Sequence, residues 1–125
     1  TYAGNLVSLS EIADHRRYHF SHTDIRDGQA LRELFDKHQP SAIMHLAAES
    51  HVDRSIDGPG AFLETNIMGT YTLLQAVRGY LDTVSSARST DFRFHHVSTD
   101  EVYGTLQETG SFLETTAHWR YRGRH

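Results

Sequence analysis

The stretch Ala42-Ile43-Met44-His45-Leu46-Ala47-Ala48 (AIMHLAA) is a compact apolar run that indicates the fold class of this 125-residue chain. Runs of this kind are typical of a parallel β-strand that is buried on both faces. Such a strand needs helices on both sides of its sheet, and the crossovers between parallel strands supply them. The run therefore predicts an α/β fold, in which helices and strands alternate along the chain.

The residues before this run fit a strand followed by a helix. Arg17–Asp24 (RYHFSHTD) alternates large and polar residues, which predicts a short strand. Asp27 can cap a helix, and Pro40 would end it. The apolar positions of this helix keep a helical spacing and predict its buried stripe: Ala30, Leu31, Leu34 and Phe35.

The residues after the run fit a second helix and a further strand. A polar loop, Glu49–Gly58, leads to Pro59, which suits the first turn of a long helix that reaches about Thr83. We expect Asp82–Asp91 to be a polar linker and Phe92–Ser98 (FRFHHVS) to be a strand. Within the long helix, four apolar residues keep helical spacing: Ile67, Tyr71, Leu74 and Leu81.

The resulting order of strand, helix, strand, helix and strand predicts right-handed parallel crossovers and a doubly wound α/β sheet. In such sheets, ligands bind beyond the carboxyl ends of the strands. Three polar segments fall there, namely Thr23–Ile25, Ala47–Ser55 and Ser98–Tyr103. One site could collect all three.

The composition excludes several classes of protein. Hydrophobic residues make up 38% and charged residues 22% of the chain, as in a globular domain rather than a disordered tail. The net charge of -4 argues against a nucleic-acid or membrane-surface binder, because both need a cationic surface. Without cysteine, the chain has no disulfide, thiolate metal site or cysteine nucleophile. No signal-peptide pattern or long apolar stretch stands out, so we expect a soluble, cytoplasmic protein.

The segment Ser98-Thr99-Asp100-Glu101 is the strongest candidate for chemistry. Two adjacent carboxylates in a cleft could take different protonation states, so that one is a general acid and the other a general base. The Thr99 hydroxyl could bind a reacting sugar hydroxyl or carbonyl. The alternative is an ordinary polar turn after a strand, in which Asp100 caps local backbone amides.

The loop Ala47–Arg54 (AAESHVDR) is the second candidate. Small residues at the end of a strand let a cofactor approach the backbone closely, and the polar residues after them can hold a ligand. The alternative is a solvated loop whose Asp53 and Arg54 form a surface ion pair of little energetic value.

Other signals are weaker. The chain has ten histidines, but His95 and His96 should point to opposite faces of a strand, so we predict no metal site. Gly58-Pro59-Gly60 lacks the third glycine and the preceding strand of a dinucleotide-binding turn. Lys37 is the only lysine, and no tyrosine has a lysine at the fourth position after it.

From Thr1 to about Thr116 the chain resembles an internal piece of the dTDP-glucose 4,6-dehydratase family, within the extended short-chain dehydrogenase/reductases. The motifs that carry the resemblance are TYAGNL at 1–6, HLAAESHVDRSI at 45–56, ETNI at 64–67, GTY at 69–71 and FRFHHVSTDEVYG at 92–104. The resemblance implies a Rossmann-like NAD-binding domain and a reaction in three stages. Hydride leaves C4 of the sugar, water is eliminated across C5–C6, and the hydride returns to C6, which gives dTDP-4-dehydro-6-deoxyglucose.

The resemblance also implies roles for individual residues. Asp100 would protonate the departing C6 hydroxyl, Glu101 would take the C5 proton, and Thr99 would hydrogen-bond the C4 oxygen. Ser50 would lie near both substrate and cofactor. The residues that would bind NAD are Thr1, Asp24, Ile25, Leu46, Ala47, Ala48, Glu49, Ser50 and Thr65.

The same resemblance predicts that this is part of a domain. Residues 1–116 would be a partial NAD-binding domain without its first two strands and Gly-rich turn, and residues 117–125 a divergent basic tail. The family's Tyr-x-x-x-Lys pair is not in these residues, and Arg124 stands roughly where its tyrosine should be. We therefore expect the 125 residues to be inactive alone, and the intact enzyme to be a homodimer. The alternative is a non-catalytic fragment of another nucleotide-sugar dehydratase or epimerase.

Overall fold

The computed structural model describes residues 4–50, 58–104 and 110–118. Two short strands, β1 (Ala42–His45) and β2 (Arg93–His96), pair in parallel, with Ala42 opposite Arg93 and His45 opposite His96. The pairing continues at both ends, because Arg93 N donates to Ser41 O and Val97 N donates to His45 O. The predicted parallel α/β arrangement is confirmed for these two strands.

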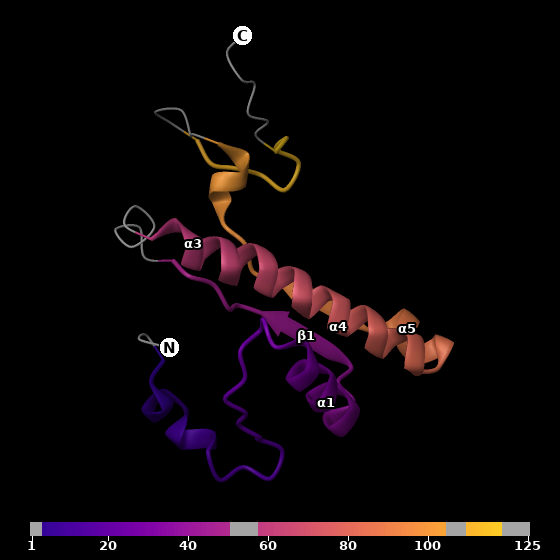
Figure 1. Ribbon diagram of the computed structural model, residues 1–125. Helices are drawn as coiled ribbons and strands as arrows, with labels where there is room; N and C mark the ends of the chain where they lie inside the picture. The colour runs from indigo at the N-terminus through magenta and orange to yellow at the C-terminus, as the bar shows by residue number, and fades with distance from the viewer. Residues whose placement is uncertain (1–3, 51–57, 105–109, 119–125) are drawn as a thin grey trace.

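The crossover between the strands is helical throughout its main run (Figure 1). It consists of α3 (Pro59–Phe62), the π-helical segment η2 (Leu63–Gly69) and α4 (Thr70–Thr83), followed by the short α5 (Ser86–Asp91). Before β1 lies α1 (Gly28–His38). Two 3₁₀ segments complete the described elements, η1 (Leu6–Ile12) and η3 (Asp100–Tyr103).

Helix α1 forms as its sequence predicts. The Asp27 side chain accepts hydrogen bonds from the backbone N–H of Gln29 and Ala30, which satisfies two of the unpaired donors of the first turn. The helix ends where Gln39 adopts a left-handed conformation with φ 48°, and Pro40 follows. The predicted stripe faces inward, since Leu31 and Phe35 are buried.

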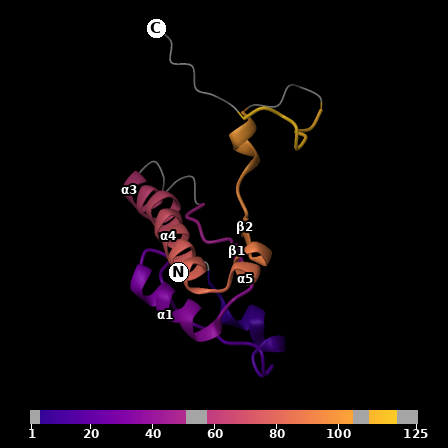
Figure 2. The same cartoon turned by 90° about the vertical axis from the view of Figure 1, so that its right-hand side faces the viewer.

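The core lies between α1 and α4, which pack against each other on one side of the sheet (Figure 2). The Tyr80 ring lies 5.8 Å from the Phe35 ring and 6.1 Å from the Phe92 ring, and its hydroxyl donates to Pro40 O at 2.9 Å. This arrangement satisfies the polar end of a buried tyrosine. The buried apolar residues are Leu31, Phe35, Leu73, Ala76, Val77, Tyr80 and Phe92.

The prediction that the apolar run is buried on both faces is wrong for the described residues. Ile43 and Phe94 pack against the core, but Met44, on the opposite face of β1, is 64% exposed. Both helices that flank β1 lie on the same side of the sheet, so only that face is covered. The strand is also shorter than the run and ends at His45, before Leu46.

Two further predictions about local structure are wrong. Arg17–Asp24 is not a strand, because a strand needs a ladder partner and the only ladder among the described residues joins β1 to β2. Asp82–Asp91 is not a plain linker, because its second half is α5, which the Ser85 hydroxyl caps by accepting from Arg88 N.

The long helix was predicted with the correct ends, and its four apolar residues at helical spacing divide between core and solvent, since Leu81 packs against the core. Ile67, Tyr71 and Leu74 are exposed (58%, 55% and 45%), whereas Leu73 and Val77 are buried. The helix carries two apolar stripes, and helical spacing alone does not tell which of them faces the core. None of the helices in the described ranges is long and apolar enough to cross a membrane.

Candidate functional site

The segments after β1 and β2 leave the sheet at the same edge, because the strands are parallel. Leu46–Ser50 follows β1 and runs toward α3, while Val97–Thr99 follows β2 and leads away from the helical layer into η3 (Figure 2). The structure thus places the described residues of two of the three predicted polar segments at one edge, the edge at which ligands of such sheets bind.

The π-helical segment η2 fixes the backbone of the loop after β1. The Asn66 side chain accepts from Glu49 N at 2.8 Å and donates to Glu49 O at 2.9 Å. This reciprocal pair satisfies both backbone groups of a half-buried residue that has left the sheet ladder. Asn66 is not among the site residues predicted from the sequence. Its signal was the motif Glu64-Thr65-Asn66-Ile67 and, in the structure, a π-helical segment, which frequently marks a functional site.

The same segment lies beside the predicted cofactor-binding residue Ile25. A Cβ at position 69 would lie only 2.7 Å from Ile25 Cδ1, so the Ile25 side chain approaches this glycine too closely for a larger residue to fit without a shift. Ile25 therefore lies beside η2, which also contains Thr65, and Asp24 precedes Ile25 in the chain. Four of the predicted cofactor-binding residues, Asp24, Ile25, Glu49 and Thr65, are thus brought to one segment.

Asp24 is engaged by its neighbour Arg26. The guanidinium donates to both carboxylate oxygens, with the shortest distance at 2.7 Å, and Arg26 N donates to Asp24 Oδ1 at 2.9 Å. These hydrogen bonds lower the pKa of Asp24 below its ordinary value, and the carboxylate in turn raises the pKa of Arg26. Both side chains are about half exposed, so the pair orients the carboxylate more than it stabilises the fold.

His45 lies beneath the site at the end of β1. Its side chain is 3% exposed, its Nε2 lies 3.0 Å from Thr70 Oγ1, and its ring stacks on the His96 ring with centroids 4.8 Å apart. Burial lowers the pKa of His45, and the neighbouring His96 lowers it further. The neutral ring therefore joins the carboxyl end of β1 to the start of α4. His45 and Thr70 were missed as positioning residues.

Around Glu49, the loop after β1 exposes its backbone to solvent. Leu46 is 63% exposed, and Ala47, Ala48 and Ser50 are exposed as well. The small side chains at positions 47 and 48 leave room for a flat ligand to approach the main chain, while Asn66 keeps the following residue fixed. This arrangement can hold a cofactor by backbone contacts, as the sequence predicts.

The predicted catalytic residues lie at the start of η3. Thr99 and Asp100 are exposed, and Glu101 belongs to the same 3₁₀ turn, although its side chain is outside the described set. The Tyr103 ring lies 5.3 Å from the Phe112 ring and 5.4 Å from the His118 ring, which fastens η3 to residues 110–118. Thr1 and residues 51–57, which include the end of the second candidate loop, lie outside the described residues.

The histidines of β2 point to opposite faces, as predicted. His96 stacks on buried His45, whereas His95 pairs with Met44 on the uncovered face. No group of three or more potential metal ligands converges within the described ranges.

The parallel strands, the helical layer and the ligand-facing edge define part of a doubly wound, Rossmann-like domain. Residues 1–120 match the sequence profile of the GDP-mannose 4,6 dehydratase family, and the chain belongs to that family.

The chain is 55% identical to dTDP-glucose 4,6-dehydratase 1 of Escherichia coli (strain K12) over 127 residues, which cover 94% of the chain and 35% of the relative. It is 54% identical to the dTDP-glucose 4,6-dehydratase of Xanthomonas campestris pv. campestris (strain B100), with 94% and 34% covered. The chain thus spans about a third of the length of these curated relatives.

Solved structures agree with this placement. DesIV, the dTDP-glucose 4,6-dehydratase of Streptomyces venezuelae crystallised with NAD and TYD bound, is 44% identical with a TM-score of 0.76, over 95% of this chain and 33% of that one. A UDP-glucose-4-epimerase of Stenotrophomonas maltophila with bound NAD is 27% identical with a TM-score of 0.63, over 80% of this chain and 27% of that one.

Proposed function

We propose that this chain is the central part of the NAD-binding domain of a dTDP-glucose 4,6-dehydratase, which converts dTDP-glucose to dTDP-4-dehydro-6-deoxyglucose and water. The observation that carries the proposal is the identity of 55% to a curated dTDP-glucose 4,6-dehydratase over 94% of the chain. It is supported by the position of Thr99-Asp100-Glu101 shortly after the end of β2, at the edge where ligands of such sheets bind.

The residues around η2 fit the proposed cofactor. Asp24 and Ile25, held beside Gly69, would meet the adenine, and Thr1 would lie near its ribose. The open backbone of Leu46, Ala47 and Ala48 would line the dinucleotide, together with Glu49, Ser50 and Thr65. NAD, when bound, supplies an acceptor for the hydride of sugar C4 and later returns that hydride to C6.

The carboxylates would carry out the elimination. Once C4 of the sugar is a ketone, its C5 proton is acidic enough for Glu101 to remove as a general base. Asp100 would donate a proton to the departing C6 hydroxyl, so that water leaves. The Thr99 hydroxyl would hydrogen-bond the C4 oxygen, and Ser50 would contact the sugar. Two carboxyl groups in different protonation states are what this acid and base pairing needs.

The second candidate function is that of another nucleotide-sugar dehydratase or an epimerase. A 4-epimerase removes no C6 hydroxyl, so it has no use for the Asp100-Glu101 pair. The lower identity of 27% to the UDP-glucose-4-epimerase also favours the dehydratase.

The 125 residues alone would be inactive, because they contain no Tyr-x-x-x-Lys pair to activate the C4 hydroxyl and no Gly-rich phosphate turn. For the intact enzyme we propose a homodimer that uses the exposed stripe of Ile67, Tyr71 and Leu74, a row of apolar side chains that solvent would otherwise cover. A cytoplasmic location, and the lack of nucleic-acid or membrane partners, stay predictions from the sequence.

A chimera tests the proposed function. Residues 1–116 replace the aligned segment of the Escherichia coli relative, which supplies the remaining parts of the enzyme. We expect the chimera to convert dTDP-glucose to the 4-keto-6-deoxy product, detected as loss of water by mass spectrometry. Asp100→Asn and Glu101→Gln should each lower the rate at least about 100-fold, the scale of general acid–base catalysis.

The matched control is Asp82→Asn, which removes an exposed carboxylate at the far end of α4 and should leave the rate unchanged. A folded chimera that binds NAD but releases no 4-keto product would contradict the proposal. Formation of a 4-epimer in its place would support the epimerase alternative.

A further inference from the structure

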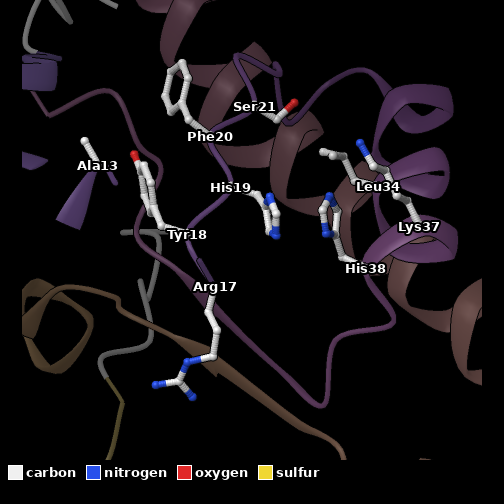
Figure 3. Close-up of a pocket in the computed structure, with 9 residues that line it drawn as sticks. All are labelled: Ala13, Arg17, Tyr18, His19, Phe20, Ser21, Leu34, Lys37 and His38. Atoms are coloured by element: carbon white, nitrogen blue, oxygen red, sulfur yellow. The ribbon is translucent and has the colours of Figure 1, made fainter. Parts of the chain in front are cut away.

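A tight turn at residues 24–27 leads the chain into α1. Residues 17–21 lie across a pocket from the last turns of this helix (Figure 3). The chain then reverses at the other end of α1, where Asp27 N donates to Asp24 O at 3.0 Å and the Asp27 side chain caps the helix. The backbone of Asp24 is thus held at the start of a helix that packs in the core.

Arg26 lies inside this turn and hydrogen-bonds to both oxygens of the Asp24 carboxylate. Its backbone N donates to Oδ1 at 2.9 Å, its Nε lies 3.1 Å from each oxygen, and its Nη2 donates to Oδ2 at 2.7 Å. A guanidinium is a planar fork, so contacts of this kind fix the rotation of a carboxylate as well as its position. A lysine could supply the charge but not this orientation.

The Arg26 side chain is also placed by η2. A Cβ at position 69 would lie 3.4 Å from Arg26 Cγ, so the stem of this side chain passes close to Gly69, as Ile25 does. The Asp24 carboxylate raises the pKa of Arg26, and the carboxylate of Glu64 in η2 adds a smaller rise. Arg26 therefore lies between the turn that holds Asp24 and the segment that contacts the loop after β1.

The Asp24 carboxylate keeps room for one further hydrogen bond. Its two oxygens offer about four acceptor positions, and three N–H groups of Arg26 occupy three of them. The side chain is about half exposed, so a ligand can reach it. Because the guanidinium balances its charge, the carboxylate repels an anionic ligand less than a lone aspartate would. It is therefore suited to accept from a neutral N–H donor on an anionic molecule.

The base of a dinucleotide can supply such a donor. Adenine carries an exocyclic amino group, which donates, whereas hypoxanthine carries a carbonyl oxygen at the same position, which only accepts. A site that binds an N–H group rejects the analogue that lacks it, because its own acceptor is then left opposed. This rejection requires that the carboxylate cannot turn away, and Arg26 prevents that rotation.

We propose that Arg26 is a positioning residue that fixes Asp24 as the acceptor for the exocyclic amino group of the cofactor's adenine, and thereby makes the site selective for adenine. The inference rests on the proposed function, which takes NAD as the ligand and its adenine as the group at Asp24. It adds a role for Arg26, which acts through Asp24 and needs no contact of its own with the cofactor.

The test compares the affinities of the cofactor-free chimera for NAD and for nicotinamide hypoxanthine dinucleotide, by calorimetric titration. We expect NAD to bind at least about tenfold more tightly, as the loss of one charge-assisted hydrogen bond predicts. Arg26→Gln should lower this ratio at least about threefold, because the carboxylate can then turn away from the carbonyl oxygen. Arg26→Lys keeps the charge without the fork and should lower the ratio as well. A general loss of structure would weaken both dinucleotides by the same factor and leave the ratio unchanged.

The matched control is Arg32→Gln, which makes the same change of charge on an exposed residue of α1 and should keep the ratio of the unaltered chimera. The proposal is overturned if the chimera binds the two dinucleotides equally, or if Arg26→Gln gives the same ratio as Arg32→Gln. A chimera that binds neither dinucleotide would overturn it together with the NAD site. The dehydratase function is decided separately, by release of the 4-keto product from a chimera that binds NAD.

Discussion

Substitution of Asn66 by alanine should both destabilise the fold and disorganise the loop that follows β1. The change removes the two hydrogen bonds, 2.8 Å and 2.9 Å long, that join its amide to Glu49 N and Glu49 O. Each is worth about 1 kcal/mol net, so we expect the free energy of unfolding to fall by about 2 kcal/mol. That is a large part of the roughly 5–15 kcal/mol by which whole domains are stable.

The structure also predicts that aspartate cannot replace this asparagine. Asn66→Asp keeps an acceptor for Glu49 N but directs a carboxylate oxygen at Glu49 O, where the amide donated before. The loss should therefore be at least as large as for alanine, although aspartate is nearly isosteric. Urea unfolding of the 125-residue chain measures the free energies, and NAD titration of the chimera measures the effect on the loop.

The control for both variants is Gln75→Ala, which removes an exposed amide from α4. Surface changes of this kind usually alter the free energy of unfolding by less than about 0.5 kcal/mol. If Asn66→Ala and Gln75→Ala destabilise the chain equally, the Asn66–Glu49 pair contributes nothing, and η2 does not fix the loop. An unchanged NAD affinity of the Asn66→Ala chimera would separately refute the link between this pair and the cofactor.

Three other perturbations test the packing around the site. Gly69→Ala should lower the free energy of unfolding by about 1–3 kcal/mol, because its Cβ would clash with Ile25. Gly79→Ala, whose Cβ would meet nothing within 4 Å, should raise it by up to about 1 kcal/mol. Thermal melts measure both variants, and equal shifts of the melting temperature would contradict this prediction. Because burial lowers the pKa of His45, the unfolded chain binds a proton at pH values where the folded chain does not, so stability should fall as the pH drops below about 6.5. The urea midpoint of His45→Asn should fall less over the same pH range. Asp27→Ala should lower the free energy of unfolding by about 1 kcal/mol, because α1 loses its N-cap. An unchanged urea midpoint would contradict this role of Asp27.

Local signals in the sequence predict the helices well. Asp27 marks the start of α1 and Pro40 its end, and Pro59 and Thr83 bound the long helical run as expected. These helix ends depend on side chains only a few residues away, so they can be predicted from apolar spacing and capping residues. The strand positions Ala42–His45 and Arg93–His96 lie within the predicted runs for the same reason.

Features that depend on distant partners could not be predicted in this way. Arg17–Asp24 has the alternation of a strand, but alternation does not supply a neighbour to pair with. Helical spacing identified Ile67, Tyr71 and Leu74, yet the position of α1 decides that Leu73 and Val77 face the core. The hydrogen bonds of Asn66 with Glu49 join residues 17 positions apart, and neither composition nor local spacing predicts them.

The positions of the candidate cofactor residues therefore depend on the helix more than on the sheet. Ile25 packs at Gly69, Glu49 bonds to Asn66 and His45 meets Thr70, so two segments of the chain, one at Ile25 and one at residues 45–49, are held by η2 and the first residue of α4. A two-stranded sheet is too small to be stable by itself, but these contacts need only the packing of α4 on α1. The segment proposed to be catalytic is held differently, because the described ring contacts of η3 are those of Tyr103 with residues 110–118. Changes in the helical layer should consequently affect cofactor binding before they affect the positions of Asp100 and Glu101.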